Sequence, residues 1–252
     1  MKKIPTFIVN LPQSTERKAY MERILAPFDF LDIRFMEAVY GRALTEEELT
    51  QRFDAGLAYK RYGRELERGE IGCSLSHFEC YHRLVESGEN FCLILEDDIT
   101  LLRDFSDVQR LIPFIDCEEP RVLLLSGDYW FTRRKPIDAD YRLADVFAAV
   151  GTYAYFINRA AARVILESNP RCANAADDWV LLRRQGFKMK AVFPYMVDAN
   201  IESFDSEINQ SHFGELKRNM PLAIRLRAYW TAALKKYLVM SSHFVSKIRK
   251  KE

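Results

Sequence analysis

Hydrophobic residues along this chain gather in short runs that alternate with longer stretches of helical periodicity. The apolar runs predict buried strands at residues 6–11, 33–39, 91–95, 121–125, 147–157 and 188–193. Apolar positions at helical spacing predict helices at residues 14–25, 70–86, 159–167 and 177–184, with a further helix opening at Thr45. Strands alternating with helices are typical of an α/β fold, and strands this apolar predict a sheet covered on both faces.

Local signals set several of the boundaries. Ser14 stands where a helix N-cap is expected, and Thr45 with Glu48 has the spacing of a capping box. Residues 59–68 are polar and charged and contain Gly63, so we expect them to form a connection between elements.

Composition narrows the class of protein. The chain has 252 residues, of which 48% are hydrophobic and 29% charged, with ten glycines and nine prolines. These values exclude a disordered or collagen-like chain, and the length allows one large domain or two small ones. We find no apolar run near the roughly 18 residues that a membrane span needs. We also find no secretory signal, so we expect a cytoplasmic protein whose five cysteines are free thiols.

The charges are divided unevenly along the chain. Residues 216–252 carry ten basic side chains and one acidic one, a formal charge of +9. Residues 1–215 carry 27 basic and 35 acidic side chains, a formal charge of −8. We therefore expect two parts, a globular body at 1–215 and a basic segment at 216–252 that meets something anionic.

The basic segment has the pattern of an amphipathic helix that begins at Pro221. Basic residues flank an apolar stripe that consists of Leu222, Leu226, Trp230, Ala233, Tyr237, Phe244 and Ile248. Such a helix suits the interface of an anionic membrane leaflet. The alternative is a helix that packs on the body. A nucleic-acid partner is not expected, because the rest of the chain has no basic face.

Three consecutive acidic residues, Glu96, Asp97 and Asp98, directly follow the apolar run at 91–95. Like charges at close range resist joint ionisation, and a divalent cation would relieve the repulsion. Side chains alternate along a strand, so Glu96 and Asp98 should point to one side and Asp97 to the other. Carboxylates at the end of a strand suit Mg²⁺ or Mn²⁺ shared with a phosphate-bearing ligand.

The alternative for this triplet is a solvated turn that ends the strand. The chain lacks both Gly-rich phosphate-binding motifs, so a diphosphate here would need a metal as its main counter-charge. The motifs of serine hydrolases and zinc proteases, G-x-S-x-G and H-E-x-x-H, are also absent from the sequence.

Three sequence blocks carry a likeness to a known family. They are I-V-N-L at 8–11 followed by Arg17, G-E-I-G-C-S-L-S-H at 69–77 followed by L-I-L-E-D-D at 93–98, and G-T-Y-A-Y-F-I-N-R at 151–159. In order and spacing, over roughly residues 4 to 210, the chain resembles glycosyltransferase family 25. These are bacterial lipopolysaccharide and lipooligosaccharide glycosyltransferases that include β-galactosyltransferases. The second block is long and specific.

The resemblance implies a GT-A-like fold, in which a mixed sheet flanked by helices binds a nucleotide sugar. It implies a UDP-sugar donor, commonly UDP-galactose, inversion of the anomeric centre, and an acceptor saccharide on a lipid-linked core. The acidic triplet stands where that fold keeps its D-x-D-type motif. By this likeness Asp98 is the first metal ligand, Glu96 its helper, and Asp97 a contact to the donor ribose or sugar. A metal there would stabilise the charge on the departing diphosphate.

Inversion in one step needs a base behind the acceptor hydroxyl. Asp177 and Asp178 lie at a predicted helix start, next to Trp179, which could stack on a sugar face. We expect Asp178 to be the base, with Asp177 as the second candidate. The alternative role is helix capping, which acidic residues favour at a helix N-terminus. This block departs from the Pro–apolar–Asp sequence that the family more often has here.

Asn10, Leu11 and Arg17 follow the first strand, where a uracil or ribose could be held. Asn10 could equally be a turn former, and Arg17 a solvated residue on a helix face.

Four further residues have two interpretations each. His77 is either a donor contact or a buried core histidine, and His212 is either a further metal ligand or a surface residue. Gly151 and Thr152 either shape the floor beneath the donor sugar or form a plain strand bulge.

We therefore expect an enzyme on the inner leaflet of the inner membrane that transfers a hexose, with galactose favoured, from a UDP-sugar with Mn²⁺ or Mg²⁺. Two other classes stay open. One is a sugar- or nucleotide-binding module without turnover, and the other is a glycoside hydrolase with paired carboxylates.

Overall fold

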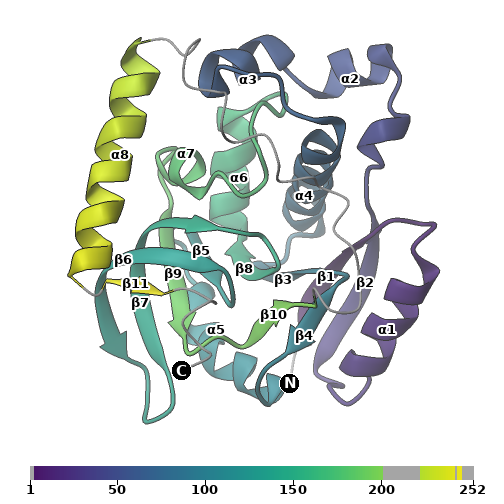
Figure 1. Ribbon diagram of the computed structural model, residues 1–252. Coiled ribbons are helices and arrows are strands. Elements are labelled where there is room, and N and C mark those ends of the chain that lie inside the picture. Colours follow the sequence, from purple (N-terminus) through teal and green to yellow (C-terminus); the bar gives the residue numbers. More distant parts are fainter. Residues whose placement is uncertain (1–2, 201–221, 242, 246–252) are drawn as a thin grey trace.

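The computed structural model describes residues 3–200, 222–241 and 243–245, and within them a nine-stranded mixed sheet forms the centre of the molecule (Figure 1). Its strand order is β11-β6-β7-β9-β5-β8-β3-β1-β2. The strands are β1 (Ile4–Asn10), β2 (Leu31–Glu37), β3 (Phe91–Glu96), β5 (Arg121–Leu124), β6 (Asp128–Pro136), β7 (Arg142–Val150), β8 (Ala154–Asn158), β9 (Lys188–Phe193) and β11 (Phe244–Val245). A separate antiparallel pair joins β4 (Ile99–Leu101) to β10 (Val197–Ala199).

The pairing of the strands determines where the site can form. β1 runs parallel to both β2 and β3, and β5 runs parallel to β9, whereas the other neighbours in the sheet are antiparallel. In this register Val9 lies opposite Glu96, so the carboxyl ends of β1 and β3 meet at one edge of the sheet. Ligands of open α/β sheets bind at such an edge.

Helices cover both faces of the sheet. They are α1 (Thr15–Leu25), α2 (Glu46–Arg52), α3 (Ala55–Tyr62), α4 (Arg68–Ser87), α5 (Ile112–Ile115), α6 (Arg159–Ser168), α7 (Trp179–Arg183) and α8 (Leu222–Met240), with 3₁₀ turns η1 (Gly41–Ala43) and η2 (Phe105–Leu111). Cys92 and Ile94 of β3 pack with residues of α4 and α6, whereas Leu93 and Leu95 pack with α1, η2 and α5 on the other face. The predicted α/β fold, with a mixed sheet flanked by helices, is confirmed.

Several local predictions are confirmed and others are wrong. The capping box at Thr45 is present, and α4 extends the predicted helix by one or two residues at each end. Ser14 occupies the N-cap position of α1, but its side chain makes no capping hydrogen bond. Part of the expected connection at 59–68 is helical, because α3 continues to Tyr62 before Gly63 ends it with φ of 70°. The expected strand at 147–157 is two strands, β7 and β8, interrupted at Gly151 with φ of 91°.

The basic segment contributes α8 and β11, which flank the β6 edge of the sheet (Figure 1). Leu238 is buried, Lys235 Nζ lies 4.1 Å from the Trp130 ring centroid, and Phe244 stacks on the same ring. These contacts confirm the alternative of packing on the body for this end of α8. Most of the predicted stripe nevertheless faces solvent, including Leu222, Leu226, Trp230 and Tyr237. Ile248 lies outside the described residues, and the division at residue 215 stays a prediction.

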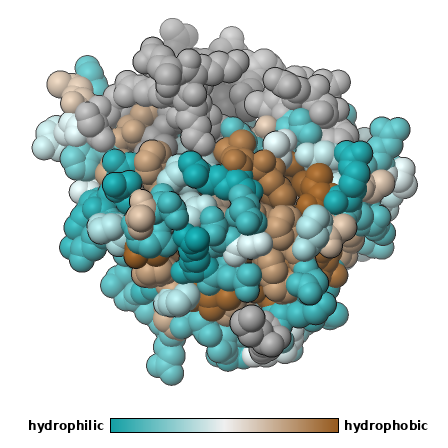
Figure 2. Space-filling model, turned by 90° about the horizontal axis from the view of Figure 1, so that it is seen from below, coloured by the Kyte–Doolittle hydropathy of each residue, from teal (hydrophilic) through white to brown (hydrophobic). Residues whose placement is uncertain are grey.

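The rest of the described surface is mixed. Seen from below, apolar side chains lie toward the middle of the face and hydrophilic ones surround them (Figure 2). Among the described residues, no helix combines the length and the apolar character that crossing a bilayer requires. All five cysteines are free thiols, as predicted.

Candidate functional site

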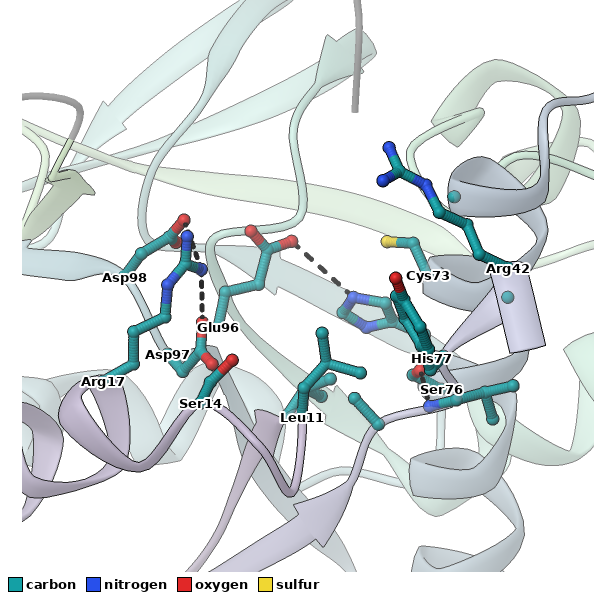
Figure 3. Close-up of a pocket in the computed structure, with 16 residues that line it drawn as sticks. Leu11, Ser14, Arg17, Arg42, Cys73, Ser76, His77, Glu96, Asp97 and Asp98 are labelled. Carbon is teal, nitrogen blue, oxygen red and sulfur yellow. Dashed lines mark hydrogen bonds and ion pairs between the residues drawn. The ribbon is translucent and has the colours of Figure 1, made fainter. Parts of the chain in front are cut away.

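The candidate site lies at the edge of the sheet where β1 and β3 end. β3 stops at Glu96, and Asp97 and Asp98 form the turn that leads into β4. The expected alternation of the three acids is therefore wrong beyond Glu96. Asp97 and Asp98 both reach Arg17, whereas Glu96 points across the cavity toward α4 (Figure 3).

Asn10 and Arg17 hold Asp97 from two sides. Asn10 Nδ2 donates to one Asp97 oxygen at 2.7 Å, and Arg17 Nη1 donates to the other at 2.9 Å. Arg17 Nη1 also lies 3.3 Å from Asp98 Oδ2. Sequence reasoning placed Asn10, Arg17 and Asp97 at one site, and the structure brings them together. Because both Asp97 oxygens are occupied, this carboxylate orients Asn10 and Arg17.

Asp98 is the acid that remains incompletely satisfied. Its Oδ1 is buried and has no hydrogen-bond partner within the described chain. Burial and the neighbouring charges of Glu96 and Asp97 raise the pKa of Asp98 to about 6, against the opposing effect of Arg17. A carboxylate that burial and like charges disfavour, with a lone oxygen facing no donor, has the environment of a cation ligand.

Glu96 stands between Asp98 and α4 (Figure 3). The Thr152 hydroxyl donates a short hydrogen bond to Glu96 Oε1, and His77 Nε2 lies 3.7 Å from the same oxygen. Thr152 therefore positions a predicted metal ligand. His77 is 1% exposed, as expected of a buried core histidine, and it also lines the cavity. A contact from His77 to the donor stays a prediction.

One wall of the cavity is the close contact between η1 and α4. The Val39 amide donates to Ser76 Oγ at 2.8 Å. A Cβ at Gly72 would lie 2.5 Å from the Val39 carbonyl oxygen, and one at Gly41 would lie 1.7 Å from the Arg68 carbonyl oxygen. Glycine is therefore required at both positions for this contact. This contact forms one side of a cavity of about 160 Å³, which Leu11 and Arg17 also line.

Sequence reasoning missed part of this lining, namely Ser14, Tyr40, Arg42, Cys73 and Ser76. Two signals were available. Residues 40–42 follow a predicted strand, where a parallel sheet places its ligands. Cys73 is four residues before His77, so the two share a helix face.

The second acidic pair lies where β7 and β8 separate. The Gly151 amide donates to Asp177 Oδ2 at 3.2 Å, and Trp179 Nε1 donates to the Gly151 carbonyl oxygen at 2.9 Å. Burial raises the pKa of Asp177, with further increases from Asp178 and Glu96 and a decrease from the Gly151 hydrogen bond. Gly151 thus links Asp177 to the break between β7 and β8. The charge of Glu96 contributes to the raised pKa of Asp177, so the two acidic clusters interact electrostatically.

Asp178 makes different contacts from Asp177. It is the N-cap of α7, where Oδ1 accepts from the Leu181 amide at 3.0 Å, and Oδ2 accepts from the Tyr62 hydroxyl at 2.9 Å. The capping role is confirmed. Trp179 is fully buried, so the expectation that it stacks on a sugar is wrong. His212 lies outside the described residues.

Comparison with known proteins identifies the family of this chain. The model of glycosyltransferase family 25 (LPS biosynthesis protein) matches residues 3–180. The chain belongs to this family. The matched residues include both acidic clusters and the whole wall formed by η1 and α4.

Individual family 25 relatives align with part of the chain. Procollagen galactosyltransferase 1-B of Xenopus laevis is 32% identical over 39% of this chain and 18% of its own length. A glycosyltransferase 25 family member of Anopheles gambiae is 37% identical over 37% of this chain and 16% of its own length. The inactive glycosyltransferase 25 family member 3 of Homo sapiens is 29% identical over 65% of this chain and 29% of its own length. The chain thus spans less than a third of each of these relatives.

Proposed function

We propose that this family 25 chain is a metal-assisted, inverting glycosyltransferase that moves a hexose from a UDP-sugar to a saccharide acceptor, with galactose as the favoured hexose. The single observation that carries the proposal is Asp98. This acid lies in the turn that follows a buried strand beside the cavity, has the like charges of Glu96 and Asp97 near it in addition to Arg17, and keeps a buried oxygen without a partner among the described residues. A UDP-sugar with a divalent ion would satisfy all three features at once.

The residues present fit a hard divalent ion. Asp98 and Glu96 offer carboxylate oxygens, which are the ligands that Mg²⁺ and Mn²⁺ prefer. Such an ion would supply positive charge to the diphosphate as it leaves the sugar. Arg17, fixed by Asp97, adds a guanidinium at the same edge. Leu11 lines the cavity that the nucleoside would enter, and Asn10 next to it holds Asp97.

Asp177 is our proposed base. The acceptor oxygen bonds to the anomeric carbon while the bond from that carbon to the diphosphate breaks, and the hydroxyl proton passes to a carboxylate. Asp177 has a raised pKa and lies within the electrostatic influence of Glu96. Both oxygens of Asp178 already accept hydrogen bonds, from Tyr62 and Leu181. This ranking reverses the one that the sequence favoured.

The acceptor in this proposal is the saccharide of a lipid-linked lipopolysaccharide or lipooligosaccharide core, met at an anionic membrane surface. α8 supports it, since Trp230 is 70% exposed and Met240 is 76% exposed. The charges of Asp178 and Asp177 act on Lys235 of the same helix, so α8 lies near the proposed base. Aromatic and aliphatic residues beside cations favour binding to anionic lipid.

Vesicle flotation tests the membrane part of the proposal. The double variant Leu226→Glu/Trp230→Glu should bind anionic vesicles about 10-fold more weakly than the unchanged chain, because two apolar contacts become charged. Leu102→Glu, which changes an exposed leucine on the body, is the matched control. Equal partitioning of all three proteins would exclude α8 as a membrane contact.

The second candidate function is a sugar- or nucleotide-binding module without turnover. The similarity to the human family member that is named inactive favours this second candidate, because it is a family 25 protein named as lacking activity. Release of UDP from UDP-galactose, UDP-glucose and UDP-N-acetylglucosamine, measured with truncated core acceptors in Mn²⁺ or EDTA, separates the two. Transfer predicts acceptor-dependent, EDTA-sensitive release, whereas UDP binding without release supports the module.

A further inference from the structure

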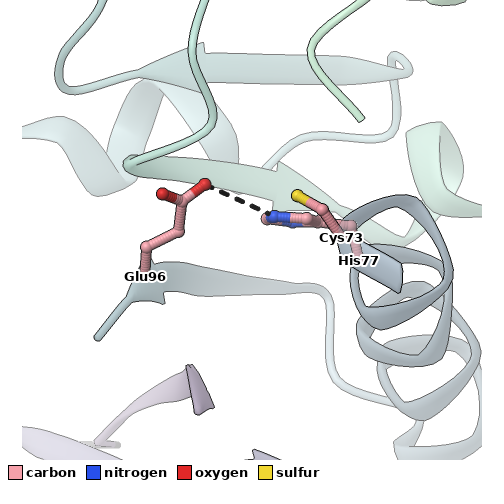
Figure 4. A group of neighbouring side chains, drawn as sticks. All are labelled: Cys73, His77 and Glu96. Atoms are coloured by element: carbon pink, nitrogen blue, oxygen red, sulfur yellow. Dashed lines mark ion pairs between the residues drawn. The ribbon is translucent and has the colours of Figure 1, made fainter. Parts of the chain in front are cut away.

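A second group of side chains that could ligate a metal lies beside the cavity, on the side of Glu96 that faces away from Asp98 (Figures 3 and 4). Cys73 and His77 are four residues apart on α4, so their side chains lie one above the other on one helix face. Glu96 reaches them from the end of β3. The Cys73 sulfur, a His77 ring nitrogen and a Glu96 oxygen all lie within 4.8 Å of one another.

His77 is held as a metal-binding histidine would be. Its Nδ1 lies 2.8 Å from the Tyr155 hydroxyl, which is itself 2.9 Å from the Tyr81 hydroxyl. When the Nδ1 proton is donated to Tyr155, Nε2 presents a lone pair toward Glu96. This Nε2 is buried and has no hydrogen-bond partner in the part of the chain that the structure describes. A hydrogen bond on the far nitrogen is the usual support of a histidine ligand.

The spacing of the atoms suits a small tetrahedral ion. Two nitrogen or oxygen ligands about 2.1 Å from zinc lie about 3.4 Å apart at the tetrahedral angle. The observed separation of His77 Nε2 and Glu96 Oε1 is 3.7 Å, so only a small movement would bring both to one ion. Sulfur, imidazole and carboxylate together favour Zn²⁺ over the harder Mg²⁺ and Mn²⁺.

The surrounding charge also favours a cation. Burial raises the pKa of the Cys73 thiol, and the carboxylates of Glu96, Asp177 and Asp98 raise it further, against a hydrogen bond with Thr152. The same carboxylates attract a divalent ion, and its binding would displace the thiol proton to solvent.

We propose that Cys73, His77 and Glu96 form a site for Zn²⁺ or a similar thiophilic divalent cation, distinct from the site at Asp98, with one position left for water. Binding of zinc does not depend on the proposed transferase function. One consequence does depend on it. Glu96 would be shared by the two sites, so zinc would withdraw Glu96 from the donor site and inhibit transfer.

The test is a titration of the full metal-free chain with Zn²⁺ by calorimetry in excess Mg²⁺. A parallel titration with Co²⁺ is followed by absorption, because thiolate ligation gives a near-ultraviolet charge-transfer band. We expect one equivalent to bind. Since changing a supporting group costs 10- to 100-fold in affinity, removing a ligand by Cys73→Ala or His77→Gln should weaken binding by about 100-fold or more. Tyr155→Phe, which removes the support of Nδ1, should weaken it about 10-fold.

Two variants serve as controls. Cys117→Ala removes a cysteine whose contacts are with Glu119 and Asn158, and it should bind zinc as the unchanged chain does. Asp98→Ala should also retain zinc, which separates this site from the proposed donor metal.

The proposal is overturned if the unchanged chain shows no saturable zinc binding, or if Cys73→Ala and His77→Gln bind as tightly as it does. Circular dichroism and thermal unfolding check that each variant folds. Cys73→Ala keeps the test decisive if the buried His77 cannot be replaced. Zinc that binds at Cys73 but leaves UDP release unchanged would reject the sharing of Glu96.

Discussion

The two acidic clusters of the candidate site are built in different ways. Around Asp97, charge is compensated by side chains, with Asn10 and Arg17 each donating to one carboxylate oxygen. Around Asp177, the partner is a backbone amide at Gly151, and that glycine is itself held by the Trp179 indole. A site held by side chains tolerates backbone change more readily than a site held by backbone groups. The two clusters should therefore respond differently to substitution.

The largest expected effect is on the first cluster. Asp98→Ala should lower acceptor-dependent UDP release by at least about 10³-fold, because it removes the proposed metal ligand and the charge stabilisation it provides. The exposed Asp140→Ala is the matched control and should retain turnover. Full activity of Asp98→Ala in EDTA would contradict the assignment of Asp98 as a metal ligand.

The next effect separates the two acids of the second cluster. Asp177→Asn should lower kcat by about 10² to 10³-fold with little change in the KM for the donor, since it removes the proposed base but leaves an amide oxygen for Gly151. Asp178→Asn should keep most activity and stability, because asparagine is also a good N-cap. The reverse outcome would assign the base to Asp178.

A smaller effect tests the wall between η1 and α4. Gly72→Ala should lower the free energy of unfolding by about 2 to 3 kcal/mol, because the new Cβ would lie 2.5 Å from the Val39 carbonyl oxygen. Denaturant unfolding measures it. The control is Gly56→Ala in α3, where the nearest atom to the new Cβ is Asp54 Oδ1 at 3.6 Å, and stability should be unchanged or slightly higher. Equal stability of the two variants would mean that η1 and α4 are not in close contact.

The smallest effect is the pH dependence that Asp98 causes. Its pKa rises from 3.8 to about 6 on folding, so its contribution to stability is full below about 4 and is lost as pH rises through 6. Metal-free Asp98→Asn should therefore be more stable than the unchanged chain at pH 7.5, by about 1 to 2 kcal/mol, and equal to it near pH 4. Thermal unfolding at both pH values measures the difference. A constant difference across this range would contradict the raised pKa.

The first cluster could be predicted from the sequence because its residues lie at or just after the ends of apolar runs that predict strands. Asn10 and Glu96 end apolar strands that pair in parallel, and the carboxyl ends of paired parallel strands meet at one edge of the sheet. The specific block at 69–77 forms α4, as its periodicity indicates. Gly72 within it is explained by the close contact with Val39.

The second cluster could not be predicted in the same way. Its geometry depends on the break at Gly151, which looked like the middle of one strand, and on Tyr62, which is more than 100 positions away in the sequence. β6 was also missed, because its second half is charged and ends in proline, and its pairing with β7 includes register shifts. Contacts between distant residues decide these features.

Gly151 has a consequence for protein engineering. Its amide donates to Asp177 and its carbonyl oxygen accepts from Trp179, the first residue of α7, while the adjacent Thr152 positions Glu96. A chimera that exchanges residues 170–187 to test the proposed acceptor side would thus need a replacement segment that keeps a carboxylate for the Gly151 amide and an indole for its carbonyl oxygen. Without them, the exchange would disturb Glu96 and the proposed donor site as well.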